Sequence, residues 1–525
     1  MSSSIAARRA TAAQADKVAT THNQGSKARL GAPRSSCSRC LEALLAFAIL
    51  GGEVSCDRAA PPQAAPSTVA ASATQVPRAA VSAEPGYFVS LRQSSIDVRL
   101  CFSAAPGRHM LPHDAAPERL VESMQLSHAG KVSGLERDGS GFALPDGLGK
   151  GDCVDYSIAL DKLRGIGAPN RTRQYGEDWL LCADYWLWHA EQVTELPLSF
   201  SLPPGTTASF PWQQRDGHYL VPLDAHRWKS VGAVGSLQTQ RLRAGEFDLE
   251  VASLGDEAPA PYLAWLTASA KAASIPFRGD PPLAALVVLA PEPSRGDSFG
   301  FAFHGGGRSS LIWAARSATE GSIGEDWAAT HELFHLLMPY VRMEDAWFSE
   351  GVTTYYTAIL RGRAGALNDK QVWWELVDGF ERGSRVAGEL PLQRESELMH
   401  EHRSYWRVYW SGAAIALSWE LELAKAGKSL DEVMQALGRY GREKAELYTA
   451  EELIRRVEKE LKVSLWSLAE PALASASFFD YQPLLDQLGV HGDSKHLSLR
   501  KSKLADLRER LTRGPDADKS QRAER

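Results

Sequence analysis

The chain has 525 residues, of which 44% are hydrophobic, and its formal net charge at pH 7 is −6. This length supports two to four packed domains. The acidic balance, and the lack of any stretch in which Lys and Arg alternate with aromatic residues, argue against a nucleic-acid-binding protein.

The first 56 residues are typical of a targeting segment. Ala, Ser and basic residues dominate positions 1–40, and the apolar run 41–50 has the length of a signal-peptide core, too short for a membrane span. We therefore expect an exported protein of the periplasm or cell envelope. Cys56 loosely resembles the lipidation site of bacterial lipoproteins, so a lipid anchor and an ordinary signal peptide are both open.

The next two segments differ sharply in composition. Residues 57–85 are mostly Ala, Pro, Ser, Thr and Val, which cannot bury enough apolar surface to fold, so a disordered linker is expected. From 86 to 245 short apolar runs alternate with Gly, Pro, Asp and Asn, which predicts an antiparallel β domain, and we infer a β-sandwich. The expected strands are 88–91, 96–102, 153–160, 196–202 and 219–222.

Three cysteines fall in the part of the chain that we expect to fold: Cys101, Cys153 and Cys182. Three thiols allow one disulfide and leave one over. Buried free cysteines explain them equally well, so the pairing stays open.

The sequence HELFH at 331–335 has the pattern H-E-x-x-H. On a helix, His331 and His335 lie one turn apart on the same face, so their imidazoles can converge on one metal ion. Glu332 lies one step round the helix and can reach a metal-bound water. No Gly or Pro interrupts the residues from Asp326 to Met338, and Pro339 cannot continue a helix, so a helix is expected here.

A hydrolytic zinc site usually has a third protein ligand. Glu350 follows His335 after fourteen intervening residues, opens a helix-compatible stretch over 350–360, and is the candidate. HELFH, WFSEG at 347–351 and TTYY at 353–356 together resemble the gluzincin zinc metallopeptidases, most closely the glycyl aminopeptidase family (M61) and more distantly the aminopeptidase N family (M1). The resemblance implies that Glu350 is the third Zn²⁺ ligand, although the gap before it is a turn shorter than in M1.

The resemblance also implies the architecture of the second half of the chain. A thermolysin-like zinc peptidase domain is expected over 246–425, with a helix at 262–274 and strands at 283–290 and 310–316 before the metal helices. A C-terminal helical region is expected over 426–490 and a charged tail over 491–525. The expected fold class is α+β, and helices are predicted at 413–425, 430–440 and 450–461.

In such a site Zn²⁺ lowers the pKa of its water, and Glu332 takes the proton as the water attacks a peptide carbonyl. The developing oxyanion needs a second donor. Tyr409 is the candidate, because YWSGA at 409–413 resembles the Tyr-x-x-Gly-Ala stretch of the gluzincins; a packed core Tyr is the alternative. We therefore expect an exported zinc metallopeptidase that acts on peptides or proteins.

The segment 300–310, GFAFHGGGRSS, is where an extended substrate would add as an extra strand. Related aminopeptidases carry a Glu in this segment that binds the free amino group of the substrate, and this chain has none there. Aminopeptidase and endopeptidase activity therefore both stay open. The candidate substrate-binding residues are Gly305, Gly306, Gly307 and Arg308. Arg308 could bind a substrate carboxylate, but a solvated Arg is the commoner explanation.

Two other functions are weighed against the peptidase. Residues 296–300 match the G-x-S-x-G elbow of serine hydrolases around Ser298, and HGGG at 304–307 matches their oxyanion segment, but the two motifs stand in the reverse order. A non-catalytic envelope binding protein that keeps a peptidase fold would explain the missing Glu.

Overall fold

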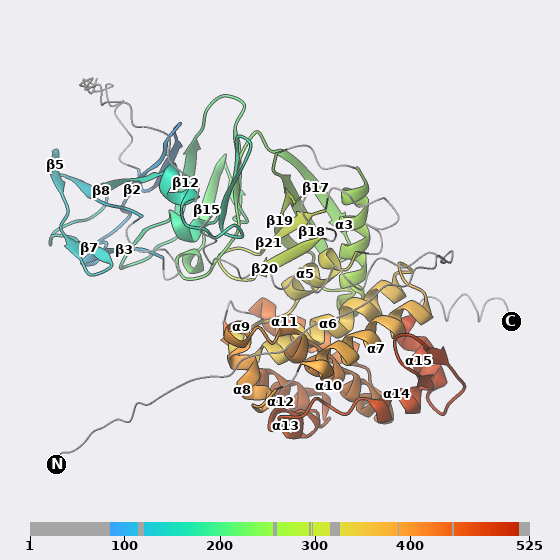
Figure 1. Cartoon of the computed structure of the whole chain (residues 1–525). Coiled ribbons are helices and arrows are strands. Elements are labelled where there is room, and N and C mark those ends of the chain that lie inside the picture. Colours follow the sequence, from blue (N-terminus) through green and yellow to red (C-terminus); the bar gives the residue numbers. More distant parts are fainter. Residues whose placement is uncertain are drawn as a thin grey trace, which may run out of the picture.

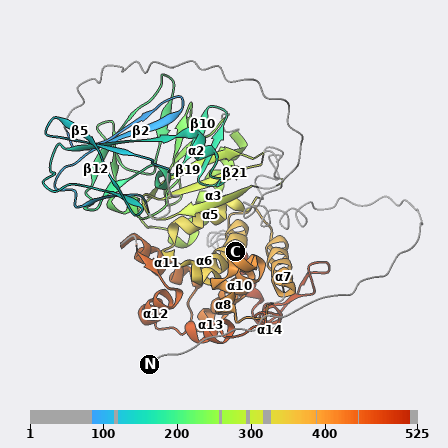
Figure 2. The ribbon, with the colours of Figure 1, turned by 60° about the vertical axis from the view of Figure 1, so that its left-hand side comes forward.

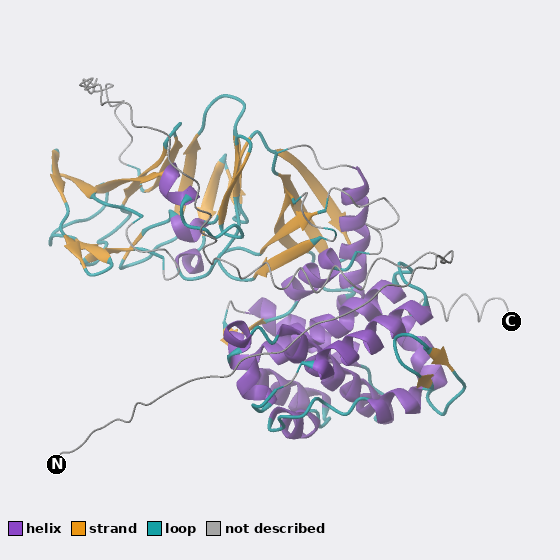
Figure 3. Ribbon diagram, in the orientation of Figure 1, coloured by secondary structure: helices purple, strands orange, loops and turns teal. Residues whose placement is uncertain are grey.

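The structure, a computed structural model, describes residues 84–113, 120–255, 260–292, 296, 298–315, 326–386, 388–443 and 446–513. The expected targeting segment, its Cys56 and nearly all of the linker lie outside the described residues. A β-rich N-terminal region, a five-stranded sheet and a helical C-terminal region follow one another (Figures 1 and 3). None of the helices in the described residues has the length and apolar character needed to span a membrane.

Three sheets surround one core in the N-terminal region, and the five expected strands are all present. Strand β1 pairs with β12 in parallel, so the largest sheet is mixed and not wholly antiparallel as predicted. Val154, Met110 and Trp179 come from the three different sheets and share this core. The eight-stranded sheet has the order β14 (Gln214–Arg215), β15 (His218–Val221), β12 (Leu196–Ser201), β1 (Gly86–Leu91), β2 (Ser95–Cys101), β8 (Cys153–Ala159), β4 (Met124–His128), β5 (Lys131–Gly134). The four-stranded sheets have the orders β13 (Thr207–Ser209), β16 (Ala233–Gly235), β10 (Asp178–Leu181), β9 (Thr172–Tyr175) and β11 (His189–Ala190), β3 (His109–Leu111), β7 (Gly141–Ala143), β6 (Arg137–Asp138).

One disulfide staples the largest sheet. Cys101 and Cys153 stand directly opposite each other on β2 and β8 and are bonded. Cys182 is a free, fully buried thiol whose pKa is raised by burial. Of the two alternatives left open by the sequence, one disulfide with one thiol left over is therefore confirmed.

A separate five-stranded sheet supports the rest of the molecule. Its central strands β18, β19 and β21 are parallel, and the two outer strands are antiparallel to their neighbours. Both faces are covered, which explains the continuous apolar runs of β19 and β21. The sheet begins at Gln238, eight residues before the expected boundary at 246, and the sequence did not predict its first two strands. Its order is β17 (Gln238–Ala244), β18 (Phe247–Ser253), β19 (Leu283–Pro291), β21 (Ser309–Ala314), β20 (Phe299–Phe303).

Helices dominate the described residues from 326 onwards and pack around fully buried aromatic side chains such as Trp347, Trp373 and Trp419. Two short strand pairs accompany them, β22 (Tyr340–Val341) with β23 (Leu447–Tyr448) and β24 (Val490–His491) with β25 (Ser498–Leu499). The three predicted late helices are confirmed, although one of them begins eight residues earlier than predicted. The segment predicted as a charged tail is folded up to residue 513, because Leu511 is buried and Thr512 Oγ1 donates to Asp369 at 2.6 Å. The helices are α3 (Ala260–Ala273), α5 (Ala328–Leu337), α6 (Ala346–Arg363), α7 (Asp369–Arg385), α8 (Leu392–Glu397), α9 (Met399–His402), α10 (Tyr405–Lys425), α11 (Leu430–Glu443), α12 (Ala450–Leu461), α13 (Trp466–Leu473), α14 (Gln482–Leu488) and α15 (Ala505–Thr512).

Candidate metal centre

Helix α5 carries the HELFH motif and lies between the five-stranded sheet and the helical region (Figures 1 and 2). Its start is set by Asp326, whose carboxylate accepts hydrogen bonds from the main-chain N–H groups of Ala328 and Ser298, both at 2.9 Å. Burial raises the pKa of Asp326 to about 6. The helix ends before Pro339, as the sequence predicts, and every residue of it is buried.

The three predicted metal ligands meet in space. Nε2 of His331 lies 3.2 Å from Nε2 of His335, and each of these atoms lies 3.3 Å from Oε2 of Glu350. Zinc bonds of about 2.0–2.1 Å in a tetrahedron place neighbouring ligand atoms about 3.3–3.4 Å apart. The two imidazoles and the carboxylate therefore match three corners of a tetrahedral zinc site.

Glu350 reaches this position from helix α6, which begins at Ala346, four residues before it. The connection from α5 is short and ordered: Tyr340 and Val341 form strand β22, which pairs with β23 (Leu447–Tyr448), and a single helical turn follows. Burial acts to raise the pKa of Glu350, but His335 and His331 hold it far below its ordinary value. The carboxylate is therefore charged and ready to bind a cation.

Helix α6 also contacts the two imidazoles at their Nδ1 atoms, on the side opposite the metal-binding Nε2 atoms. Thr357 Oγ1 lies 3.1 Å from Nδ1 of His331, and Thr353 Oγ1 lies 3.3 Å from Nδ1 of His335. Each threonine hydroxyl donates to a main-chain carbonyl of α6 at 2.7 Å, so towards the histidine it acts as the acceptor. The proton of each ring therefore sits on Nδ1, which leaves both Nε2 lone pairs for the metal.

Glu332, the predicted general base, lies beneath edge strand β20. A Cβ placed on Gly300 would come within 2.5 Å of Glu332 Cγ, so only glycine leaves room for this carboxylate. Burial, reinforced by the charge of Glu350, raises the pKa of Glu332 to about 8. A carboxylate that gains a proton near neutral pH suits a general base.

Tyr409, the predicted oxyanion donor, comes to the same site from helix α10. Its hydroxyl is hydrogen-bonded to Glu350, and burial, together with Glu350 and Glu332, raises its pKa well above the ordinary value, so it keeps its proton. Helices α6 and α10 cross here at two glycines: a Cβ on Gly351 would lie 2.4 Å from Gly412 Cα. Because main chain meets main chain at this crossing, the two glycines set the distance between helix α6 with Glu350 and helix α10 with Tyr409.

No family model matches the chain, and no curated protein matches its sequence. Among solved structures, an aminopeptidase N family protein from Idiomarina loihiensis is similar, with a TM-score of 0.60 and 14% identity over 77% of this chain and 78% of that one. The chain has the aminopeptidase N fold. An M1 zinc metallopeptidase from Deinococcus radiodurans is also similar, with a TM-score of 0.48 and 15% identity over 76% of this chain and 95% of that one.

The similarity to the Idiomarina loihiensis protein supports the gluzincin fold expected from the motifs. The nearer resemblance to family M61 stays a prediction. At 14% identity the shared feature is the fold. The ligand assignment to His331, His335 and Glu350 therefore rests on their geometry in this chain.

The glycine segment after β20, for which substrate binding is predicted, packs closely against the N-terminal region. A Cβ on Gly306 would lie 2.8 Å from Trp228 O, and one on Gly307 would lie 2.4 Å from Pro211 O. Both glycines have positive φ angles and let the segment pack closely against the N-terminal region. Of the four predicted substrate-binding residues, Gly305 and Arg308 line a cavity at the C-terminal end of β20.

Ser298 is not an exposed nucleophile. Its side chain is completely buried, its N–H donates to Asp326, and Ala315 N–H lies 3.4 Å from its hydroxyl oxygen. His304, the first residue of the HGGG match, is engaged with the carbonyl oxygen of His335 at 2.7 Å. The serine hydrolase alternative is therefore wrong; Asp297 of that motif lies outside the described residues.

Sequence reasoning missed a pair at the rim of the site. His400 Nδ1 lies 2.9 Å from the hydroxyl of Tyr405, whose ring makes an edge contact with Tyr409 at 6.4 Å between centroids. Burial lowers the pKa of His400, and the charge of Glu350 acts against that shift. In the sequence, the only sign of the contact between Tyr405 and Tyr409 is their spacing of four residues on one helix.

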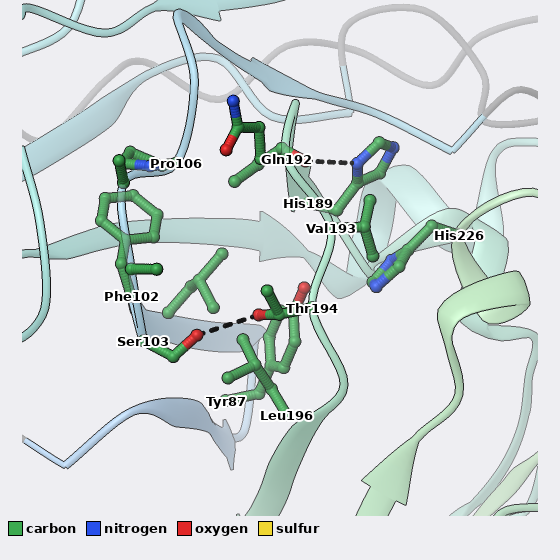
Figure 4. A pocket seen from close by; sticks show the side chains of 14 residues that line it. Tyr87, Phe102, Ser103, Pro106, His189, Gln192, Val193, Thr194, Leu196 and His226 are labelled. Carbon is green, nitrogen blue, oxygen red and sulfur yellow. Dashed lines mark hydrogen bonds between the residues drawn. The ribbon is translucent and has the colours of Figure 1, made fainter.

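The N-terminal region has a small pocket of its own, shown in Figure 4. A hydrogen bond of 3.0 Å between the side chains of Ser103 and Thr194 lies on one side of the pocket. The rings of His189 and His226, 4.8 Å apart between centroids, line another side. Burial and two neighbouring histidines lower the pKa of His226 to about 3, so this ring is neutral. With about 20 Å³ of room, the pocket holds about one water and offers no chemistry comparable to the metal centre.

Proposed function

We propose that the protein is a zinc metallopeptidase that hydrolyses peptide bonds with a Glu-activated water. The observation that carries the proposal is the triangle formed by His331, His335 and Glu350, with edges of 3.2 to 3.3 Å, next to the buried carboxylate of Glu332. Three protein ligands leave a fourth corner free, which is typical of catalytic zinc. Two imidazoles and one carboxylate also favour zinc over harder cations.

The roles of the residues follow from their positions. Zinc supplies Lewis acidity and a water of lowered pKa. Glu332 accepts the proton of the attacking water and passes it to the leaving amine. The neutral hydroxyl of Tyr409 donates a hydrogen bond to the carbonyl oxygen as negative charge develops there.

The outer edge of β20 would hold the peptide. In the sheet order β20 is the outermost strand, and it runs over helix α5. Its Phe299, Phe301 and Phe303 pack away from the site against the core shared with the N-terminal region. The alternating positions, Gly300 and Ala302, face the metal helix and carry no carboxylate that could bind a free amino group. An endopeptidase, or an exopeptidase with another mode of amine recognition, fits this surface.

The cellular location is a further proposal that rests on residues 1–56 alone. We propose export to the periplasm or cell envelope, with a lipid anchor through Cys56 as one of two outcomes. Mass spectrometry of the N-terminus of the protein made in its host distinguishes them: a diacylated Cys56 indicates a lipoprotein, an unmodified new terminus an ordinary signal peptide, and an intact residue 1 contradicts export.

The experiment that tests the function uses the full chain, loaded with zinc, and one set of peptides with free and with acetylated amino termini. Cleavage of both forms at internal bonds supports an endopeptidase, and cleavage of free termini alone supports an aminopeptidase. Peptide binding without cleavage, unchanged by Glu332→Gln, supports the alternative of a non-catalytic binding protein and contradicts the metallopeptidase.

A further inference from the structure

A cavity of about 150 Å³ lies at the C-terminal end of β20, beside the metal centre. Four parts of the chain that are distant in sequence meet in its wall: the N-terminal region, the segment after β20, strand β22, and the end of α11 with Glu446. The side chains that matter here are Trp228, His304, Arg308, Tyr340, Arg442 and Glu446.

Arg308 brings a positive charge to the wall of this cavity. Its Nη2 donates to the carbonyl oxygen of Gly441 at 2.7 Å, and its Nη1 donates to the carbonyl oxygen of Leu336. Among the described residues no ion pair involves Arg308, and burial together with nearby Arg442 lowers its pKa to about 10. Because Arg308 is only partly exposed, its charge is less well hydrated than one on the open surface, and a bound anion would compensate it.

The other charges around the cavity do not fill this role. Arg442 has its own partner, because its Nη2 lies 3.5 Å from Asp280 Oδ2. Glu446 is exposed to solvent, and among the described residues no ion pair joins it to Arg308. The two hydrogen bonds of Arg308 use two of the five donors of a guanidinium group, which leaves N–H groups for a ligand.

Strand β20 connects the cavity to the metal centre. Gly300, Ala302 and His304 alternate along the chain and therefore share one face; Gly300 lies against Glu332, and His304 stacks on Tyr340 at 5.0 Å. Four residues of extended chain span roughly 13 Å. A peptide added along the free edge of β20 would thus reach the cavity about two to four residues from the bond beside the metal centre.

We propose that this cavity is a carboxylate-binding subsite and that the substrates are acidic peptides, with Arg308 as the specificity residue. The inference rests on the proposed function for the path of the peptide. The carboxylate belongs either to an Asp or Glu side chain or to the free C-terminus, and a guanidinium group binds both by charge-assisted hydrogen bonds.

Binding to the zinc-loaded Glu332→Gln protein, measured by calorimetry, tests the proposal without requiring hydrolysis. The probes are acetylated Ala-rich nonapeptides with an amidated C-terminus in which one Glu or one Gln is moved along the sequence, and a parallel Gln set with a free C-terminus. We expect one or two positions at which Glu binds about tenfold more tightly than Gln. A preference seen only for the free C-terminus also supports the subsite and assigns it to the α-carboxylate.

The matched variants are Arg308→Gln, which should abolish the preference for Glu, and Arg442→Gln, which should keep it. Because Arg308 also binds two main-chain carbonyls, Arg308→Lys, which keeps the charge, is compared by thermal unfolding and should retain part of the preference. If Arg308→Gln does not fold, the loss of the wild-type preference at high salt serves as the second measurement.

Equal or undetectable binding of the Glu and Gln peptides at every position, with either C-terminus, would overturn the proposal. Failure of the subsite and failure of the peptidase are distinguishable in the unsubstituted protein. Cleavage of Glu and Gln peptides at equal rates contradicts the subsite alone, whereas a binding preference without any cleavage supports the subsite and contradicts the peptidase.

Discussion

Thr357 Oγ1 lies 3.1 Å from Nδ1 of His331, while Nε2 of the same ring lies 3.3 Å from Glu350. The hydroxyl and the carboxylate come from one helix, seven residues apart, so α6 both completes the ligand set and orients a ligand from another helix. Thr353 does the same for His335. The acceptors behind the histidines are neutral hydroxyls, whereas carboxylates in this position raise the basicity of the ligand.

This relationship predicts that removal of the hydroxyls weakens metal binding. Thr353→Val and Thr357→Val keep the shape of the side chain and remove the acceptor of the Nδ1 proton. We expect zinc affinity, measured by competition with a chelator, to fall by about 10- to 100-fold. Thr→Ser at each position is the control and should stay near the wild-type value. Unchanged affinity in both Val variants would show that the hydroxyls do not orient the histidines.

Glu332→Gln should separate metal binding from catalysis. The carboxylate is not among the three ligand atoms, so zinc content should stay the same, while kcat falls by about 10²- to 10⁴-fold with the loss of the general base. His335→Ala, in contrast, should lose the metal. Zinc content by atomic absorption and kcat on one cleaved peptide check both variants, and substantial activity in Glu332→Gln would refute the assigned role.

Tyr409→Phe should lower kcat far more than it changes KM. The hydroxyl is expected to bind the oxygen that becomes charged during the reaction, and removal of one such donor costs about 10²- to 10³-fold in kcat. Tyr405→Phe, on the same helix and within ring contact, is the matched control and should have a small effect. Similar losses in the two variants would indicate that the tyrosines act only through packing.

The crossing of α6 and α10 should not tolerate a methyl group. A Cβ on Gly412 would lie 1.8 Å from Trp347 O, so the helices must separate in Gly412→Ala, and overpacking of this kind costs about 1–3 kcal/mol or more. Gly134→Ala is a suitable control, because nothing lies within 4 Å of a Cβ placed there. Denaturant unfolding measures the two free energies, and an unaffected Gly412→Ala would contradict the close crossing.

Stability should depend on pH through Glu420. Burial raises the pKa of this carboxyl from 4.5 to about 7, with the charge of Asp431 adding to the shift and Arg363 opposing it. The folded state thus binds the proton more tightly than the unfolded state, so the contribution of this group to stability is greatest below pH 4.5 and falls as pH rises to about 7. The loss is roughly 3 kcal/mol.

The comparison that isolates this effect is Glu420→Gln against wild type in thermal unfolding at a series of pH values. At pH 4.5 the two proteins should be close in stability, and by pH 8 the variant should be the more stable. A constant difference across this range would mean that Glu420 does not titrate in the folded protein between these values.

The candidate metal ligands lie in short segments, so local patterns can point to them. One motif on one helical turn gives His331 and His335, whereas Glu350 came from its place on the next helix-compatible stretch and from the resemblance of WFSEG to the gluzincins. The sequence did not predict the hydrogen bonds of Thr353 and Thr357 to the histidines, because Thr353 was considered only as part of a family motif. Their role depends on how α6 packs against α5, which no local pattern specifies.

Long-range contacts explain the other differences between prediction and structure. Tyr340 pairs with Leu447, more than a hundred residues later, and Arg508 in the charged C-terminal segment bonds the carbonyl oxygens of Leu488 and Arg500. The charged composition of this segment predicted a tail, but the apolar face of α15 packs into the core of the helical region. Arg308 was expected to be solvated or to bind substrate, and its contacts with Leu336 and Gly441 depend on the distant α11.

The paired glycines at positions 351 and 412 have a consequence for how this protein can change over generations. They link a ligand segment and a tyrosine segment that are sixty residues apart through main chain alone, so neither side can compensate for a bulkier neighbour by choosing another rotamer. A chimaera that takes α6 from one relative and α10 from another should therefore work only when both donors have glycine at the crossing. The two helices should therefore be exchanged together.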